Sequence, residues 1–150
     1  MRAAIELAVE NVRAGNGGPF AAVVVRDGRI IADGTNTVTS SFDPTAHAEI
    51  NAIRNACREL ADYQLQECDI YTTCEPCPMC LGALYWARPR RVYYAATRDD
   101  AAAAGFDDAF IYEEILRRCD QRRLPMQQLL RDEAQAGFEA WNAKADRVEY

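Results

Sequence analysis

The sequence predicts a single α/β domain over residues 1–150, in which helices cover both faces of a mixed sheet as a three-layer α/β/α sandwich. Two observations lead to this fold class. Helical and strand-like segments alternate along most of the 150 residues. Near the start of the chain, two strand-like segments are joined by a short turn, which gives the sheet an antiparallel edge.

The first half of the chain contributes a helix, a hairpin and a second helix. Residues 3–13 place apolar side chains at three- and four-residue intervals, which is typical of an amphipathic helix. Apolar runs that begin at Phe20 flank Asp27-Gly28, and this pattern predicts two strands joined by a tight turn. Asp43-Pro44 then predicts an N-cap for a helix that runs to about Ala61.

The second half of the chain adds three strands and four helices. Runs of β-branched and aromatic residues predict the strands, and capping residues, Gly and Pro mark the helix ends. The predicted strands cover 69–73, 91–96 and, weakly, 126–130, and the predicted helices cover 77–87, 99–105, 109–118 and 134–142. With the hairpin, this makes a five-stranded sheet. The charged tail after about Leu124 packs either on its own subunit or on a partner chain.

Composition and charge exclude several classes of protein. Hydrophobic residues make up 49% of the chain and charged residues 27%, which is the balance of a folded globular protein. No apolar run reaches the roughly 18 to 20 residues that span a bilayer, and the N-terminal residues lack the pattern of a signal sequence. We therefore expect a cytoplasmic protein without a membrane partner. The net charge of -6 argues against a nucleic acid as partner.

The cysteine pattern predicts a metal site. Three of the 6 cysteines fall between residues 74 and 80, and such clustering favours metal binding over disulfides. Cys77 and Cys80 lie in the first turn of a predicted helix, where the positive helix end favours thiolates. His47, the 1 histidine of the chain, lies near the start of another predicted helix. Two sulfurs and one nitrogen suit Zn²⁺ and leave a fourth position for water, as in a catalytic site.

Glu49 is the candidate proton carrier beside this metal. A carboxylate there would take a proton from the activated water and deliver it to the substrate. Side chains two residues apart diverge in a regular helix, however. The role therefore requires an irregular first turn, or a Glu49 side chain that reaches back towards His47.

Two other interpretations of the cysteines remain open. Cys74, Cys77 and Cys80 fit part of an iron–sulfur pattern, although the expected fourth cysteine is absent. A structural zinc site could instead use all three cysteines together with His47, which would fill the coordination sphere. That arrangement would leave Glu49 without a role.

The segments His47-Ala48-Glu49 and Pro76-Cys77-Pro78-Met79-Cys80 combine the H-x-E and P-C-x-x-C signatures of zinc nucleobase deaminases. The chain resembles the cytidine deaminase-like superfamily nearly from end to end. Within that superfamily it is most similar to the bacterial guanine deaminases. The distinguishing stretches are 81–89, 104–108 and 110–112, together with Tyr150.

This resemblance implies a cytidine deaminase-like fold and a Zn²⁺-dependent hydrolysis of guanine to xanthine and ammonia. Water activated by the metal would attack C2, and Glu49 would protonate ring N3 and later help the amine to leave. Asp108 would bind the purine edge or its amino group, although it could also cap the helix predicted to begin at Ala109. The implied substrate contacts are Asn36, Phe20, Ala48, Trp86 and Tyr150. For Phe20 and Trp86 the alternative is core packing.

The resemblance also implies a homodimer in which the segment of about 125–150 is swapped. Tyr150 would then enter the pocket of the other subunit.

Three other functions share this metal motif or fold. A tRNA adenosine deaminase would need a basic surface, but Glu113 and Glu114 each precede an arginine by four residues and offset the charge of Arg117 and Arg118. A cytosine deaminase would differ in the ring that its pocket accepts. A noncatalytic, zinc-stabilised binding protein would not need Glu49.

Overall fold

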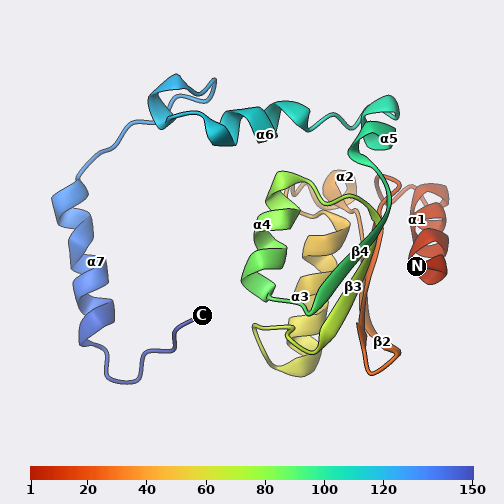
Figure 1. Ribbon diagram of the computed structural model, residues 1–150, viewed down its shortest axis with the longest axis horizontal. Coiled ribbons are helices and arrows are strands. Elements are labelled where there is room, and N and C mark those ends of the chain that lie inside the picture. Colours follow the sequence, from red (N-terminus) through yellow and green to blue (C-terminus); the bar gives the residue numbers. More distant parts are fainter. The chain divides into compact units, whose positions relative to one another are not determined.

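The computed structural model describes residues 1–150 and consists of two compact units, Met1–Ala109 and Phe110–Tyr150 (Figure 1). The first unit contains α1 (Arg2–Arg13), β1 (Ala21–Arg26), β2 (Arg29–Thr35), α2 (Val38–Ser41), α3 (Ala48–Leu60), β3 (Cys68–Cys74), α4 (Pro78–Ala87), β4 (Arg91–Ala96) and α5 (Arg98–Ala103). From the boundary onwards the chain forms α6 (Ala109–Leu116), the short 3-10 helix η1 (Cys119–Gln121) and α7 (Arg131–Ala143). None of these helices is both long enough and apolar enough to cross a membrane.

The sheet is mixed, as predicted, with the strand order β2-β1-β3-β4. Strand β1 is antiparallel to both β2 and β3, whereas β3 and β4 are parallel. Asp27 and Gly28 join β1 to β2 with φ angles of 51° and 76°. Positive φ at both positions is what a two-residue hairpin turn of this kind requires, so the predicted hairpin is confirmed.

Helices cover both faces of this sheet, which confirms the three-layer arrangement within the first unit. Helix α1 packs against β1 and β3, while α3 packs against β1 and β2 and also contacts α4 (Figure 1). Burial on both faces explains why β1 begins with four consecutive buried residues instead of an alternating pattern. The core between the sheet and α3 includes Ala22, Val24, Ala52, Ile70 and Leu84.

The prediction of a fifth strand was wrong, because the sheet has four strands. Residues 126–130 form no strand, and Leu130 lies at a φ of 51° directly before α7. The run Met-Gln-Gln-Leu-Leu lacks the alternation of apolar and polar residues that stabilises a half-buried strand. The predicted terminal helix is confirmed as α7.

The helix predicted to begin after Asp43 begins instead at Ala48. The Asp43 carboxylate accepts hydrogen bonds from the backbone N–H and the hydroxyl of Thr45, at 2.8 and 2.7 Å, and so closes a local turn. The short helix α2 precedes this turn. As a consequence His47 becomes the N-cap residue of α3, in an extended conformation with φ -70° and ψ 158°.

The second unit has no buried residue. Three arginines of its basic run pair with acidic side chains, but neither predicted pair, Glu113 with Arg117 or Glu114 with Arg118, forms. Arg117 lies 3.1 Å from Glu114, Arg118 lies 3.3 Å from Asp120, and the Nε of Arg123 lies 4.0 Å from Glu114. Local ion pairs therefore offset much of this basic run, as the charge pattern predicted.

Candidate active site

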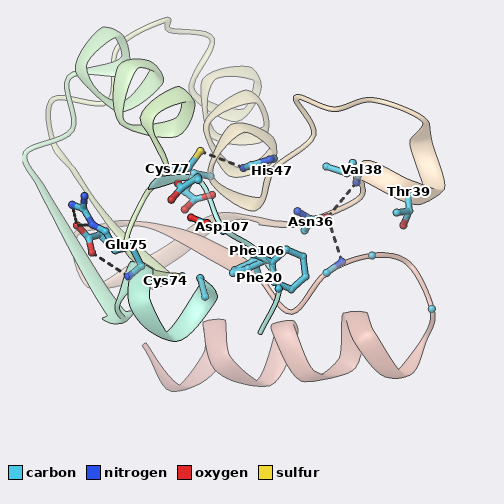
Figure 2. A pocket seen from close by; sticks show the side chains of 18 residues that line it. Phe20, Asn36, Val38, Thr39, His47, Cys74, Glu75, Cys77, Phe106 and Asp107 are labelled. Atoms are coloured by element: carbon cyan, nitrogen blue, oxygen red, sulfur yellow. Dashed lines mark hydrogen bonds and ion pairs between the residues drawn. The ribbon is translucent and has the colours of Figure 1, made fainter. Parts of the chain in front are cut away.

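A cavity of about 640 Å³ opens in the first unit, at the end of the sheet where β3 leads into α4 (Figure 2). Its lining comes from the loop after α1, the end of β2, the start of α3, the end of β3, and the segment from α5 to Asp108. This volume lies within the range of small-molecule sites.

The ligand atoms of His47, Cys77 and Cys80 lie within 4.8 Å of one another beside this cavity. His47 Nδ1 is 3.5 Å from Cys77 Sγ and 3.6 Å from Cys80 Sγ. A tetrahedral zinc with ordinary Zn–N and Zn–S bonds separates such atoms by about 3.6 Å. The three side chains therefore fit Zn²⁺ at the spacing that this metal requires. Their assignment as zinc ligands remains the interpretation made from the sequence.

Cys74 lies outside this group, which argues against a structural zinc site with three cysteines. Its Sγ donates to the carbonyl of Thr97 at 3.5 Å. Burial raises the pKa of the Cys74 thiol to about 11, so the thiol stays protonated. With His47, Cys77 and Cys80 as its protein ligands, a bound zinc would keep a fourth position for water.

Two helix N-termini present the metal-binding side chains. His47 is the N-cap of α3, and Cys77 is the N-cap of α4 with Pro78 in the first turn. The Cys77 Sγ accepts the backbone N–H of Cys80 at 3.5 Å. The side chain of Cys80, followed by His47 and the Cys80 backbone N–H, lowers the pKa of Cys77 to about 4. A thiolate at this position is the form that binds a metal.

The geometry of Glu49 resolves the difficulty that its spacing from His47 raised. Because His47 is extended and precedes the helix, its side chain and that of Glu49 in the first turn reach the same cavity. Glu49 is 6% exposed, and its two carboxylate oxygens accept hydrogen bonds from the Thr72 hydroxyl at 2.9 Å and the Cys80 thiol at 3.4 Å. Burial raises the pKa of this carboxyl.

Asn36 and Phe20 both line the cavity, as the resemblance implied. The Asn36 Oδ1 accepts the backbone N–H groups of Gly18 and Val38, each at 3.3 Å, which directs its amide nitrogen towards the cavity (Figure 2). The Phe20 ring meets Phe106 edge to face, with centroids 4.9 Å apart. Phe106 was missed as a site residue. Its only signal was its place in the stretch 104–108.

Asp108 also lines the cavity. The carboxylate of the neighbouring Asp107 accepts the backbone N–H of Ala109 at 2.9 Å. Asp107, and not Asp108, therefore makes the hydrogen bond at the start of α6. Burial, followed by the nearby Cys77, raises the pKa of the Asp108 carboxyl. At the rim, Glu75 pairs with Arg98, and the Nε of Arg98 donates to it at 3.1 Å. Sequence patterns did not indicate this pair.

Three predicted substrate contacts are not among the residues that line the cavity. Trp86 is 64% exposed, because the inner face of α4 consists of Cys80, Leu84 and Ala87. Ala48 is fully buried in the core cluster. Tyr150 belongs to the second unit. The structure thus does not bring Trp86 or Ala48 into the cavity lining.

The comparisons with known proteins identify the class of enzyme to which this fold, metal-binding group and buried glutamate belong. Residues 1–96 match the cytidine and deoxycytidylate deaminase zinc-binding region. The chain belongs to this family of zinc-dependent deaminases. Over 150 residues it is 57% identical to the guanine deaminase of Bacillus subtilis, a match that covers 100% of this chain and 96% of that protein.

Solved structures give the same result. The crystal structure of the Bacillus subtilis guanine deaminase superimposes with a TM-score of 0.97 and covers 99% of this chain and 95% of that chain. The guanine deaminase of Nitrosomonas europaea matches at a TM-score of 0.67 and 40% identity, covering 70% of this chain and 61% of that chain. The resemblance to guanine deaminases that the sequence motifs indicated is therefore confirmed.

A tRNA-specific adenosine deaminase from Agrobacterium fabrum matches a smaller part of the chain. The two are 50% identical over 78 residues, which is 52% of this chain and 51% of that protein. The similarity to the Bacillus subtilis protein extends over both compact units.

Proposed function

We propose that the protein is a hydrolytic guanine deaminase that converts guanine and water to xanthine and ammonia. The observation that carries the reaction class is the convergence, beside one cavity, of the His47, Cys77 and Cys80 group with the buried carboxylate of Glu49. The similarity to a guanine deaminase over the whole chain supports the choice of substrate.

Glu49 is the proton carrier of this proposal. His47, Cys77 and Cys80 would hold Zn²⁺, which when bound supplies a nucleophilic water near neutral pH. The Glu49 carboxylate accepts a proton from the attacking water and delivers it to ring N3, and then assists the departure of the 2-amino group as ammonia. The hydroxyl of Thr72 keeps one carboxylate oxygen in place during these transfers.

The remaining cavity residues position the purine. The amide nitrogen of Asn36 is a donor for a ring acceptor, and the Asp108 carboxylate is an acceptor for an N–H or amino group of guanine. Phe20 and Phe106 present an apolar edge against which the flat ring packs. Water displaced from this apolar part of the cavity strengthens the polar contacts that remain.

Replacing Asp108 with Ala is expected to lower kcat/KM for guanine by about 10- to 100-fold, because a hydrogen bond between a charged group and the substrate is lost. Zinc content should not change, since Asp108 lies outside the ligand group. Steady-state kinetics and metal analysis measure both effects. Asp107→Ala is the comparison variant: Asp107 also lines the cavity, but its carboxylate is bound to the backbone at the helix start, so we expect a smaller loss of activity. Full activity of the Asp108→Ala variant would show that Asp108 does not bind guanine.

The proposal also includes a homodimer with a swapped C-terminal segment. The second unit has no buried residue and exposes large apolar side chains, among them Leu116, Leu124, Leu129, Leu130 and Phe138, each at least 65% exposed. A segment with this much exposed apolar surface requires a covering surface. In the proposed dimer, Tyr150 completes the pocket of the partner subunit.

Removing residues 147–150 is expected to lower activity by about tenfold or more while fold and zinc content persist, because the truncation removes one wall of the partner's pocket. Co-expression of this truncated chain with the Glu49→Gln chain provides the sharper test. In a swapped heterodimer, the truncated subunit keeps Glu49 and receives Tyr150 from its partner, so one complete site forms and activity returns. Without a swap no site is complete, and the mixture stays as inactive as its parts.

Ammonia release from guanine, adenine, cytosine, cytidine and guanosine, with and without a chelator, tests the proposed function directly. We expect guanine to be the preferred substrate and the chelator to abolish its turnover. Preferred turnover of cytosine, or of adenosine in tRNA added as a further substrate, would overturn the choice of guanine. A protein without turnover on any of them would be a binding protein. The proposed location is the cytoplasm, an expectation that rests on the sequence.

A further inference from the structure

A buried asparagine outside the catalytic set connects helix α1 to the cavity. Asn11 is 4% exposed and lies on the face of α1 that packs against the sheet. Its amide nitrogen donates to the carbonyl of Gly18 at 3.0 Å and to the carbonyl of Asn36 at 2.9 Å. Both hydrogens of the amide are thus used, and they join two segments that line the cavity from different parts of the sequence.

The two segments that Asn11 joins are the ones that orient the Asn36 side chain. The backbone N–H of Gly18 donates to Asn36 Oδ1 at 3.3 Å, and the backbone N–H of Asn36 donates to the carbonyl of Phe20 at 3.0 Å. The loop also packs directly on Asn36, because a Cβ placed on Gly17 would lie 2.1 Å from the Asn36 carbonyl oxygen. Small displacements of this loop therefore move the hydrogen bond that holds the Asn36 amide.

We propose that Asn11 is a positioning residue that holds the amide of Asn36 with its nitrogen directed at the substrate. Asn11 itself does not line the cavity, so it acts through Asn36. A polar side chain buried in a helix face requires partners, and here both partners are backbone carbonyls of the site and none belongs to the core. The inference rests on the proposed function, in which Asn36 binds the purine.

Asn55 provides a comparison within the same fold, an exposed asparagine that makes one such bond where the buried Asn11 makes two. Its amide nitrogen donates to the carbonyl of Asp33 at 2.8 Å, which ties helix α3 to β2 in the same chemical way. Neither Asn55 nor Asp33 lines the cavity. If a helix-to-sheet amide bond served only stability, neither substitution would change KM, whatever its effect on the free energy of unfolding.

A double-mutant cycle on the full-length zinc-loaded protein tests the proposal. We expect Asn11→Ala to raise KM for guanine about tenfold and to change kcat less than about threefold. The reason is that the hydrogen bond from the Asn36 amide to guanine is weakened equally in the bound substrate and in the transition state. The double variant with Asn36→Ala should be no worse than Asn36→Ala alone. Asn55→Ala should leave KM unchanged and should combine additively with Asn36→Ala. An unchanged KM for Asn11→Ala, or additive losses in the Asn11 and Asn36 pair, would overturn the proposal.

A spectroscopic measurement separates this inference from the identity of the substrate. The side-chain amide signal of Asn36, identified by its absence in Asn36→Ala, should shift in Asn11→Ala and stay in place in Asn55→Ala. This result does not depend on guanine turnover, so a wild-type protein inactive on guanine would refute the proposed function alone. An unshifted Asn36 signal would refute the positioning role. Asn11→Ser retains a small polar group and replaces Asn11→Ala in every comparison if the alanine variant does not fold.

Discussion

Glu49→Gln is expected to lower kcat for guanine by about 10²- to 10⁴-fold while the protein keeps its fold and its zinc. Glutamine has the volume of the glutamate, and its carbonyl oxygen still accepts the hydroxyl of Thr72. It has no carboxylate to accept a proton, so both the activation of water and the protonation of the ring are lost. Steady-state ammonia release and metal analysis on the same sample measure the two effects.

Glu75→Gln is the matched control for this experiment. Glu75 is another carboxylate in the cavity lining, but it pairs with Arg98 at the rim. We expect this variant to lose far less activity than Glu49→Gln, because a rim ion pair contributes to local order and carries no proton. Unchanged turnover in Glu49→Gln would show that Glu49 is not the proton carrier.

Cys80→Ala is expected to reduce zinc content sharply and to bring guanine turnover below detection. The remaining two protein ligands would hold the metal much more weakly, and the metal supplies the nucleophile. Metal analysis, and activity before and after addition of zinc, measure the loss. Chelation of the unsubstituted protein should give the same inactive state, and added zinc should reverse only the chelated sample.

Cys74→Ala distinguishes a catalytic zinc site with three protein ligands from a structural zinc site with four. Cys74 lies three residues before Cys77 and outside the group of ligand atoms. We therefore expect this variant to keep its zinc and its metal-dependent turnover. Loss of zinc in Cys74→Ala to the extent seen in Cys80→Ala would show that the metal site is closed by a third sulfur.

The metal-binding group was the part of the site most open to prediction from sequence. Two cysteines three residues apart share one helical turn, so their convergence is a local property. The first turn of α3 was less predictable. Pro44 after Asp43 favoured an earlier helix start, whereas the turn that Asp43 makes with Thr45 delays the helix to Ala48 and frees His47.

Other outcomes depend on contacts that helical or strand periodicity does not encode. Trp86 follows Cys80 on the same helix, but the face that α4 buries consists of Cys80, Leu84 and Ala87. The run at 126–130 has residues that a strand tolerates, yet it is not part of the four-stranded sheet.

By itself, the sequence determined the class of fold, the hairpin, the candidate zinc ligands and the family resemblance, because each depends on residue type and short spacing. Only the tertiary structure decided that Phe106 shares the cavity with Glu49, and it placed Asn36 and Asp108, which the family resemblance had implied, in the same lining. It also decided that Asn11 is buried against two of the segments that line this cavity. These residues are distant in sequence, so their meeting depends on how α1, α3 and the sheet pack, and no local pattern records that packing.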